Sequence, residues 1–249
     1  MNGLGYVAAM QRLLLAFGAA LGLLASGSVA FGAGMYVGAT TGNDVGYVQC
    51  GGSLPTSSAF GIVGVTRGRA FTHNACVGAE FSWAAAAPAA PSLYMNINAA
   101  VGSTASNGNT GPAGTCRSGD KACKNYNYGY KAAQDAFDYA ASQGVAASTW
   151  WLDVETANSW LTQTAINDQV INGAIDFFHA RSLTVGVYST NYQWGKIAGS
   201  FRPGVPVWYA TGGSAEAAPG FCSSIYDFAG GGVWLVQYAG TFDTDYACP

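Results

Sequence analysis

The chain has 249 residues, of which 50% are hydrophobic, 13% aromatic and only 9% charged, whereas an ordinary soluble domain carries about 25% charged residues. This composition excludes collagen, coiled coil and acidic disorder, and it leaves enough apolar surface for one globular domain of roughly 200 residues. The net charge of −3 provides no electrostatic footprint for nucleic acid, so we expect no nucleic-acid partner.

Residues 1–30 differ from the rest of the chain. Arg12 precedes an unbroken apolar stretch over 13–25, which is shorter than a membrane-spanning helix needs. The small residues Ser28 and Ala30 predict a signal-peptidase site after Ala30. We therefore expect a signal peptide over 1–30, a domain over 31–249, and a secreted or cell-surface protein with no membrane contact after signal removal. An uncleaved membrane anchor is the alternative.

Six cysteines form an even set in a chain that we expect to be exported, where disulfides form. The expected pairs are Cys50 with Cys76, Cys116 with Cys123, and Cys222 with Cys248. A zinc site is the competing interpretation, but the chain has no C-x-x-C pair and its only histidines are His73 and His179. We therefore expect neither a metal ion nor a cofactor.

Short apolar stretches alternate with turn-rich or helical segments from residue 43 onward, which is typical of repeated βα units. The predicted strands cover 44–48, 61–65, 92–97, 147–153, 184–189, 205–210, 233–238 and 242–246. This order predicts an α/β fold, an irregular TIM-type (β/α) barrel.

Two helices are predicted between these strands. The first has apolar residues every three or four positions from Tyr130 to Ala140 and ends before Gly144, a suitable residue just past a helix C-terminus. The second covers 165–180, with apolar residues along one face. Residues 211–232 show no helical period, so the last three strands lack full crossover helices.

Residues 98–128 are rich in Gly, Ser, Asn and Thr and have no hydrophobic period. We expect a loop insertion that the bridge between Cys116 and Cys123 closes. An insertion after the third strand of a barrel lies on the catalytic face. A solvated decoration of the fold is the alternative.

A pair of acids ends the segment TWWLDVE over 149–155. Asp153 and Glu155 are one residue apart, so in an extended chain they point to the same side with Cα atoms about 6–7 Å apart. Two close carboxylates push their proton affinities apart, so that one serves as a general acid while the other stays ionised, as glycosidic bond cleavage requires. A structural salt bridge is the alternative role.

Further acids are predicted near the same mouth, because the first and last strands of a closed barrel are neighbours. They are Asp44, Asp243 and Asp245. Each of them suits a turn-capping role equally well.

The order of these motifs resembles the glycoside hydrolase family 25 lysozymes from about residue 43 to the C-terminus. DVGYVQ at 44–49 is similar to the family's opening D-V-S-x-x-Q, and WLDVE at 151–155 is similar to its L-D-x-E strand. VGVYS at 185–189, VWYA at 207–210 and WLVQY at 234–238 resemble its G-I-Y-S, L-W-I-A and W-Q-Y strands. The resemblance implies about five βα units followed by three strands.

The resemblance also implies roles for individual residues. Glu155 is expected to protonate the leaving oxygen and Asp153 to orient or stabilise the N-acetyl group of the substrate, while Asp44 and either Asp243 or Asp245 shape the site. The residues expected to bind substrate are Gln49, Trp151, Tyr188, Trp208, Gln237 and Tyr238. Aromatic faces stack on sugars, although core packing is the alternative for each ring. Trp160 is expected to be exposed.

Three segments depart from the family pattern. Gly46 replaces the serine of the opening motif, residues 65–68 replace a segment that carries Lys and Glu in many members, and residues 93–96 lack the usual tyrosine-histidine pair. These changes affect the substrate groove, so they predict a divergent exported subgroup.

The chain is therefore predicted to be a monomeric, exported glycosidase whose partner is a polysaccharide, foremost the peptidoglycan bond between muramic acid and glucosamine. The alternative is a catalytically silent wall-binding or carbohydrate-binding barrel, which the altered third strand and the negative net charge favour. A family 18 chitinase is excluded, because its D-x-x-D-x-D-x-E strand needs acids where Ser148 and Trp151 stand. A Ser-His-Asp hydrolase is excluded by the lack of a G-x-S-x-G elbow.

Overall fold

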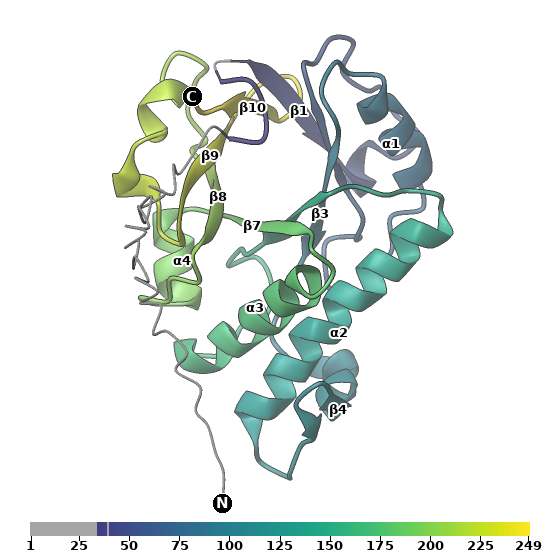
Figure 1. Cartoon of the computed structure of the whole chain (residues 1–249), viewed down its shortest axis with the longest axis vertical. Coiled ribbons are helices and arrows are strands. Elements are labelled where there is room, and N and C mark those ends of the chain that lie inside the picture. The colour runs from purple at the N-terminus through teal and green to yellow at the C-terminus, as the bar shows by residue number, and fades with distance from the viewer. Residues whose placement is uncertain (1–33, 39) are drawn as a thin grey trace, which may run out of the picture. The chain divides into compact units, whose positions relative to one another are not determined.

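The computed structural model describes residues 34–38 and 40–249, so the expected signal peptide over 1–30 lies outside the described residues. Within them the chain forms a closed barrel of eight strands in the order β1-β10-β9-β8-β7-β6-β3-β2 (Figure 1). The strands are β1 Thr41–Val45, β2 Gly61–Gly64, β3 Ser92–Asn96, β6 Thr149–Asp153, β7 Thr184–Ser189, β8 Val205–Ala210, β9 Gly230–Tyr238 and β10 Thr244–Ala247. All eight predicted strands are present, and the prediction of an irregular α/β barrel is confirmed.

The irregularity lies at the closure of the barrel. Consecutive pairs from β1 through β9 are parallel, whereas β10 pairs antiparallel with both β9 and β1. β1 ends earlier than predicted because Tyr47–Gln49 form a 3₁₀ turn. In that turn the backbone N–H of Gly46 donates to Gln49 Oε1 over 2.8 Å. The predicted substrate-binding residue Gln49 therefore stabilises this turn.

Four α-helices surround the described part of the barrel. They are α1 Val77–Ala85, α2 Lys121–Ser142, α3 Thr164–His179 and α4 Asn191–Ile197. The two predicted helices correspond to α2 and α3. The short α1 and α4 were not predicted; α4 begins where the Thr190 hydroxyl accepts from the Gln193 backbone N–H over 3.0 Å. After β8, the short 3₁₀ helices Ala218–Phe221 and Ser224–Tyr226 replace a crossover helix, as expected.

The prediction that residues 98–128 form one loop is wrong. They contain the 3₁₀ helix Gly102–Gly108 and the hairpin of β4 Thr110–Gly111 and β5 Gly114–Thr115, and α2 begins already at Lys121. The first turns of α2 lack a hydrophobic period because buried asparagine side chains there form hydrogen bonds to the backbone of the insertion. Asn125 Oδ1 accepts from the Ala100 N–H and Asn127 Oδ1 from the Ala113 N–H, each over 2.9 Å.

Three disulfides form, and they join the expected partners. Cys50 bonds to Cys76, Cys116 to Cys123, and Cys222 to Cys248. Such bridges are typical of proteins from oxidising compartments. Within the part of the chain that the structure describes, no helix combines the length and the apolar character needed to cross a bilayer.

Helices α2 and α3 lie side by side and their backbones touch (Figure 1). A Cβ atom on Gly129 of α2 would collide with the backbone carbonyl of Val170, and one on Gly173 of α3 would collide with that of Tyr126. Both glycines therefore permit the close approach of the two helices.

We expect Gly129→Ala to lower the free energy of unfolding by about 2–3 kcal/mol, because the added methyl group meets fixed backbone rather than a movable side chain. Denaturant titration followed by circular dichroism measures the change. Gly195→Ala in α4 is the matched control, since a Cβ there meets no atom within 4 Å. The control should be neutral or stabilising by up to about 1 kcal/mol. Equal stabilities for the two variants would contradict the backbone contact.

Candidate active site

Two buried indoles form the floor of the candidate site inside the barrel. Trp151 of β6 and Trp208 of β8 are 0% and 2% exposed, and their rings meet edge to face at 5.8 Å. Trp151 Nε1 donates to Ser92 Oγ over 3.2 Å and Trp208 Nε1 to Asp245 Oδ1 over 2.8 Å. The expectation that these two indoles stack on sugar is therefore wrong, because neither ring face reaches solvent.

The acid pair follows β6 as predicted. Asp153 is 6% exposed, and its Oδ1 is buried without a hydrogen-bond partner among the described residues. Glu155 is half-buried, and its Oε1 lies 3.5 Å from Gln193 Nε2 of α4. Burial and then the charge of Glu155 raise the pKa of Asp153 well above its usual range. The buried Asp153 therefore holds a proton more readily than an exposed aspartate does.

Asn96 fixes the orientation of Asp153, a role that the sequence did not reveal. Its side-chain Nδ2 donates to Asp153 Oδ2. The Thr66 hydroxyl donates to Asn96 Oδ1 over 2.7 Å and accepts from the Asn96 backbone N–H over 2.8 Å. These bonds determine which side of the Asn96 amide faces the acid, so the segment at 93–96 that departs from the family pattern still supports the pair.

A second chain of hydrogen bonds holds Asp44 on β1. Asp44 Oδ2 accepts from Gln237 Nε2 over 2.8 Å, and Gln237 Oε1 accepts from the Tyr188 hydroxyl over 2.7 Å. Burial and then the charge of Asp243 raise the pKa of Asp44 to about 7. Gln237 and Tyr188, which were expected to bind substrate, thus lie at the site and position Asp44.

The structure separates the two candidates for the late acid. Asp243 is exposed, and its backbone carbonyl accepts from the Asp44 N–H over 3.3 Å. Asp245 is fully buried, pairs in register with Gly42, and its pKa is raised well above the usual range by burial and by the charge of Asp44. Asp243 therefore lies nearer the mouth, and Asp245 lies in the layer beneath it.

Two more aromatic predictions are corrected. Tyr238 packs outside the barrel against the cluster that contains Val236 and Ala218, because it follows the inward-facing Gln237 on the same strand. Trp160 packs against the core, and its Nε1 donates to the Glu155 backbone carbonyl over 2.8 Å. Trp160 is therefore half-buried, and its hydrogen bond helps to fix the backbone of Glu155.

Tyr94 explains why glycine replaces serine at position 46. A Cβ atom on Gly46 would collide with the Tyr94 hydroxyl, and a Cβ on Gly64 would lie 2.5 Å from the Tyr94 ring. Burial and then the charges of Asp44 and Asp153 raise the pKa of Tyr94 well above its usual range. A protonated phenol therefore occupies the space where the family motif has a serine.

A cleft of about 1120 Å³ opens beside Glu155. It is lined by Arg67, Arg69 and His73 of the loop after β2, and by residues 101–104 and 157–159. Tyr47 also lines it and is 40% exposed, which makes it the aromatic ring best placed for a sugar. Tyr47 was not predicted as a binding residue because it lies inside the opening motif. Among the described residues, no three His, Cys, Asp or Glu side chains are grouped as metal ligands.

Comparison with known proteins finds sequence similarity to lysozyme-like proteins over part of the chain. A family model described as "Lysozyme-like protein 1" matches residues 120–238. "Probable GH family 25 lysozyme 3" of Dictyostelium discoideum is 32% identical over 105 residues, which is 39% of this chain and 21% of that protein. "Lysozyme-like protein 2" of Caenorhabditis elegans is 26% identical over 100 residues, 37% of this chain and 36% of that protein. The matched part of the chain thus spans well under half the length of these relatives.

A solved structure extends the likeness to the whole barrel. The family GH25 lysozyme from Aspergillus fumigatus has a TM-score of 0.54 at 12% identity, and the match covers 84% of this chain and 94% of that one. At this identity the likeness establishes the fold.

Proposed function

We propose that this glycoside hydrolase family 25-like protein is a glycosidase acting on amino-sugar polysaccharides. The observation that carries the proposal is the acid pair at the barrel mouth. Asp153 is buried and its pKa is raised by burial and by the charge of Glu155, whereas Glu155 lines the cleft. The bond to be cut therefore lies in the cleft, next to Glu155.

The two acids divide the chemistry between them. Glu155 lines the cleft and Asp153 does not, so Glu155 gives the proton to the leaving glycosidic oxygen as the carbon–oxygen bond breaks. Asp153 acts in its ionised form, beside the positive charge that develops on the sugar and on its N-acetyl group. Asn96 keeps the Asp153 carboxylate oriented through this change. A water molecule later attacks the sugar carbon and returns a proton to Glu155.

Asp44 and Asp243 complete the site in this proposal. Asp44 is held by Gln237, and the exposed Asp243 lies at the mouth, where it meets substrate. Asp245 is buried and accepts a hydrogen bond from Trp208 Nε1, so its role is to fix the Trp208 indole beneath the site. These assignments leave Asp243 rather than Asp245 as the late acid of the family pattern.

The substrate that we propose is peptidoglycan, cut at the bond from muramic acid to glucosamine by an exported protein. The three disulfides support export, because such bonds persist outside the reducing cytosol. A catalytically silent carbohydrate-binding barrel is the second candidate. It is favoured by the replacement of the usual tyrosine-histidine pair and by the net charge of −3.

The test is release of reducing ends from purified peptidoglycan by the full protein. We expect soluble fragments with muramic acid at the new reducing end, identified by mass spectrometry after borohydride reduction. Sedimentation of the protein with the polymer, without release of fragments, would instead support the silent binding barrel.

A further inference from the structure

The loop after β2 places two arginines in the cleft. Arg67 and Arg69 are exposed, and both line the same cleft as Glu155. The ion pairs found among the described residues join His73 to Asp135 and Arg202 to Asp227, so neither cleft arginine has a carboxylate partner there. The chain has only 10 Lys and Arg residues against 13 acids. Two guanidinium groups in the same cleft as Glu155 are therefore available to bind a ligand.

Hydrogen bonds fix the backbone that carries these arginines. The Thr72 hydroxyl accepts from the Arg67 N–H over 2.9 Å and donates to the Arg69 carbonyl over 2.6 Å. The Ala70 N–H, between the two arginines, donates to Asn98 Oδ1 over 3.1 Å. The arginines thus project from a defined turn rather than from a free loop, which lowers the entropy cost of binding.

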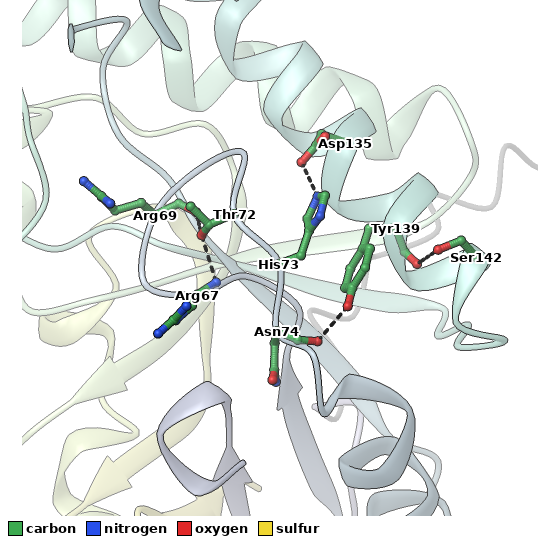
Figure 2. A network of polar contacts seen from close by, with 8 residues as sticks. All are labelled: Arg67, Arg69, Thr72, His73, Asn74, Asp135, Tyr139 and Ser142. Carbon is green, nitrogen blue, oxygen red and sulfur yellow. Dashed lines mark hydrogen bonds and ion pairs between the residues drawn. The ribbon is translucent and has the colours of Figure 1, made fainter. Parts of the chain in front are cut away.

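The far end of the loop is anchored to α2. His73 Nε2 lies 2.9 Å from Asp135 Oδ2, and its ring stacks on Tyr139 at 4.0 Å. The Tyr139 hydroxyl donates to the Asn74 carbonyl over 3.0 Å. Figure 2 shows both arginine side chains pointing away from this contact. Asp135 is therefore already occupied by His73, and the guanidinium groups remain available.

We propose that Arg67 and Arg69 form a subsite for a carboxylate carried by the sugar chain whose glycosidic bond lies at Glu155. A guanidinium group donates two parallel hydrogen bonds to a carboxylate, a geometry that lysine cannot match. The identity of the polymer as an amino-sugar polysaccharide rests on the proposed function. The subsite adds selection between such polymers by the carboxylates that they carry. The neutral amino-sugar chain of chitin offers no such group, whereas peptidoglycan strands carry carboxylates.

The test compares the same strands with and without charge. Soluble peptidoglycan strands are used as they are, or after their carboxylates have been converted to neutral amides with a carbodiimide and ammonia. Dissociation constants are measured by calorimetry and kcat/KM by release of reducing ends. For the unmodified protein we expect on the order of tenfold tighter binding and higher kcat/KM on the carboxylated strands.

The double variant Arg67→Gln, Arg69→Gln should reduce this preference to about one. Arg117→Gln is the matched control, because Arg117 is equally exposed but lies in a separate hollow beside β5 and the start of α2. The control should keep the full preference. Equal binding of both kinds of strand by the unmodified protein, or a preference that survives in the double variant, would overturn the subsite. Absence of cleavage with the binding preference intact would overturn the proposed function and leave the subsite standing.

Discussion

Glu155→Gln should lower the release of reducing ends by about 10³-fold or more, because an amide keeps the shape of the side chain and has no proton to give the leaving oxygen. The fold should tolerate the change, since Glu155 is half-buried and the amide of a glutamine can keep the 3.5 Å contact with Gln193 Nε2. Initial rates on peptidoglycan, with circular dichroism and melting of the same samples, measure both effects.

The matched control is the same substitution at Glu216, an exposed residue in the segment between β8 and β9. Glu216→Gln should leave the rate within a factor of about two. If Glu155→Gln retained normal turnover, Glu155 would not be the acid. If the unmodified protein were also inactive while both proteins still bound the polymer, the chain would be a silent binding barrel.

Asp153→Asn should lower kcat by about 10²-fold, because a neutral amide gives no charge to stabilise the positive charge that develops on the sugar. The amide oxygen still accepts from Asn96 Nδ2, so the hydrogen bond that orients the side chain persists. Asp138→Asn on the exposed face of α2 is the control and should retain the rate.

The same variant should be more stable than the unmodified protein, and increasingly so as the pH rises. The folded-state pKa of Asp153 is raised, so the folded protein binds this proton more tightly than the unfolded chain, whose aspartates have a pKa of about 3.9. The cost of burying the group is absent below about pH 4 and grows as the pH rises above it. The buried Asp44 and Asp245 act in the same direction.

Melting temperatures at pH 5 and pH 8 check this expectation. The unmodified protein should melt at the lower temperature at pH 8, and Asp153→Asn should recover several degrees of the difference. A variant that is less stable than the unmodified protein at pH 8 would show that Asp153 is held there as a favourable ion. Higher stability with lower activity would show that the site is maintained at a cost to the fold.

The barrel could be predicted because most of its strands are short apolar runs bounded by turn residues, with β1 (TGNDV) and β10 (TDYA) as the exceptions. The predicted strands 184–189 and 205–210 agree with the structure residue for residue. The beginning of α2 was missed for a physical reason. Its first turns face the insertion with Asn125 and Asn127, so polar contacts replace the apolar period from which a helix is recognised.

The acid pair could likewise be predicted, because two carboxylates at alternate positions after an apolar strand are a local pattern. The direction of aromatic side chains could not. Trp151, Trp208 and Tyr238 lie on strands whose neighbours determine which face is the interior, and sequence alone does not give that information. Asn96 was missed because its role comes from the pairing of β3 with β6, which places it opposite Asp153. The cleft arginines were missed because they lie in a loop that reaches the cleft only in the folded barrel.

The antiparallel placement of β10 has a consequence for how the molecule assembles during synthesis. Residues 244–247 lie between β1 and β9, and the Ala247 N–H donates to the Thr40 carbonyl over 2.9 Å. The barrel therefore closes only when β10 pairs with β1, and contacts between segments so distant in sequence form slowly. Nearly the whole polypeptide must therefore leave the ribosome before β10 can pair with β1 beside Asp44. A translation product that stops before β10 contains Asp153 and Glu155 but cannot close the barrel.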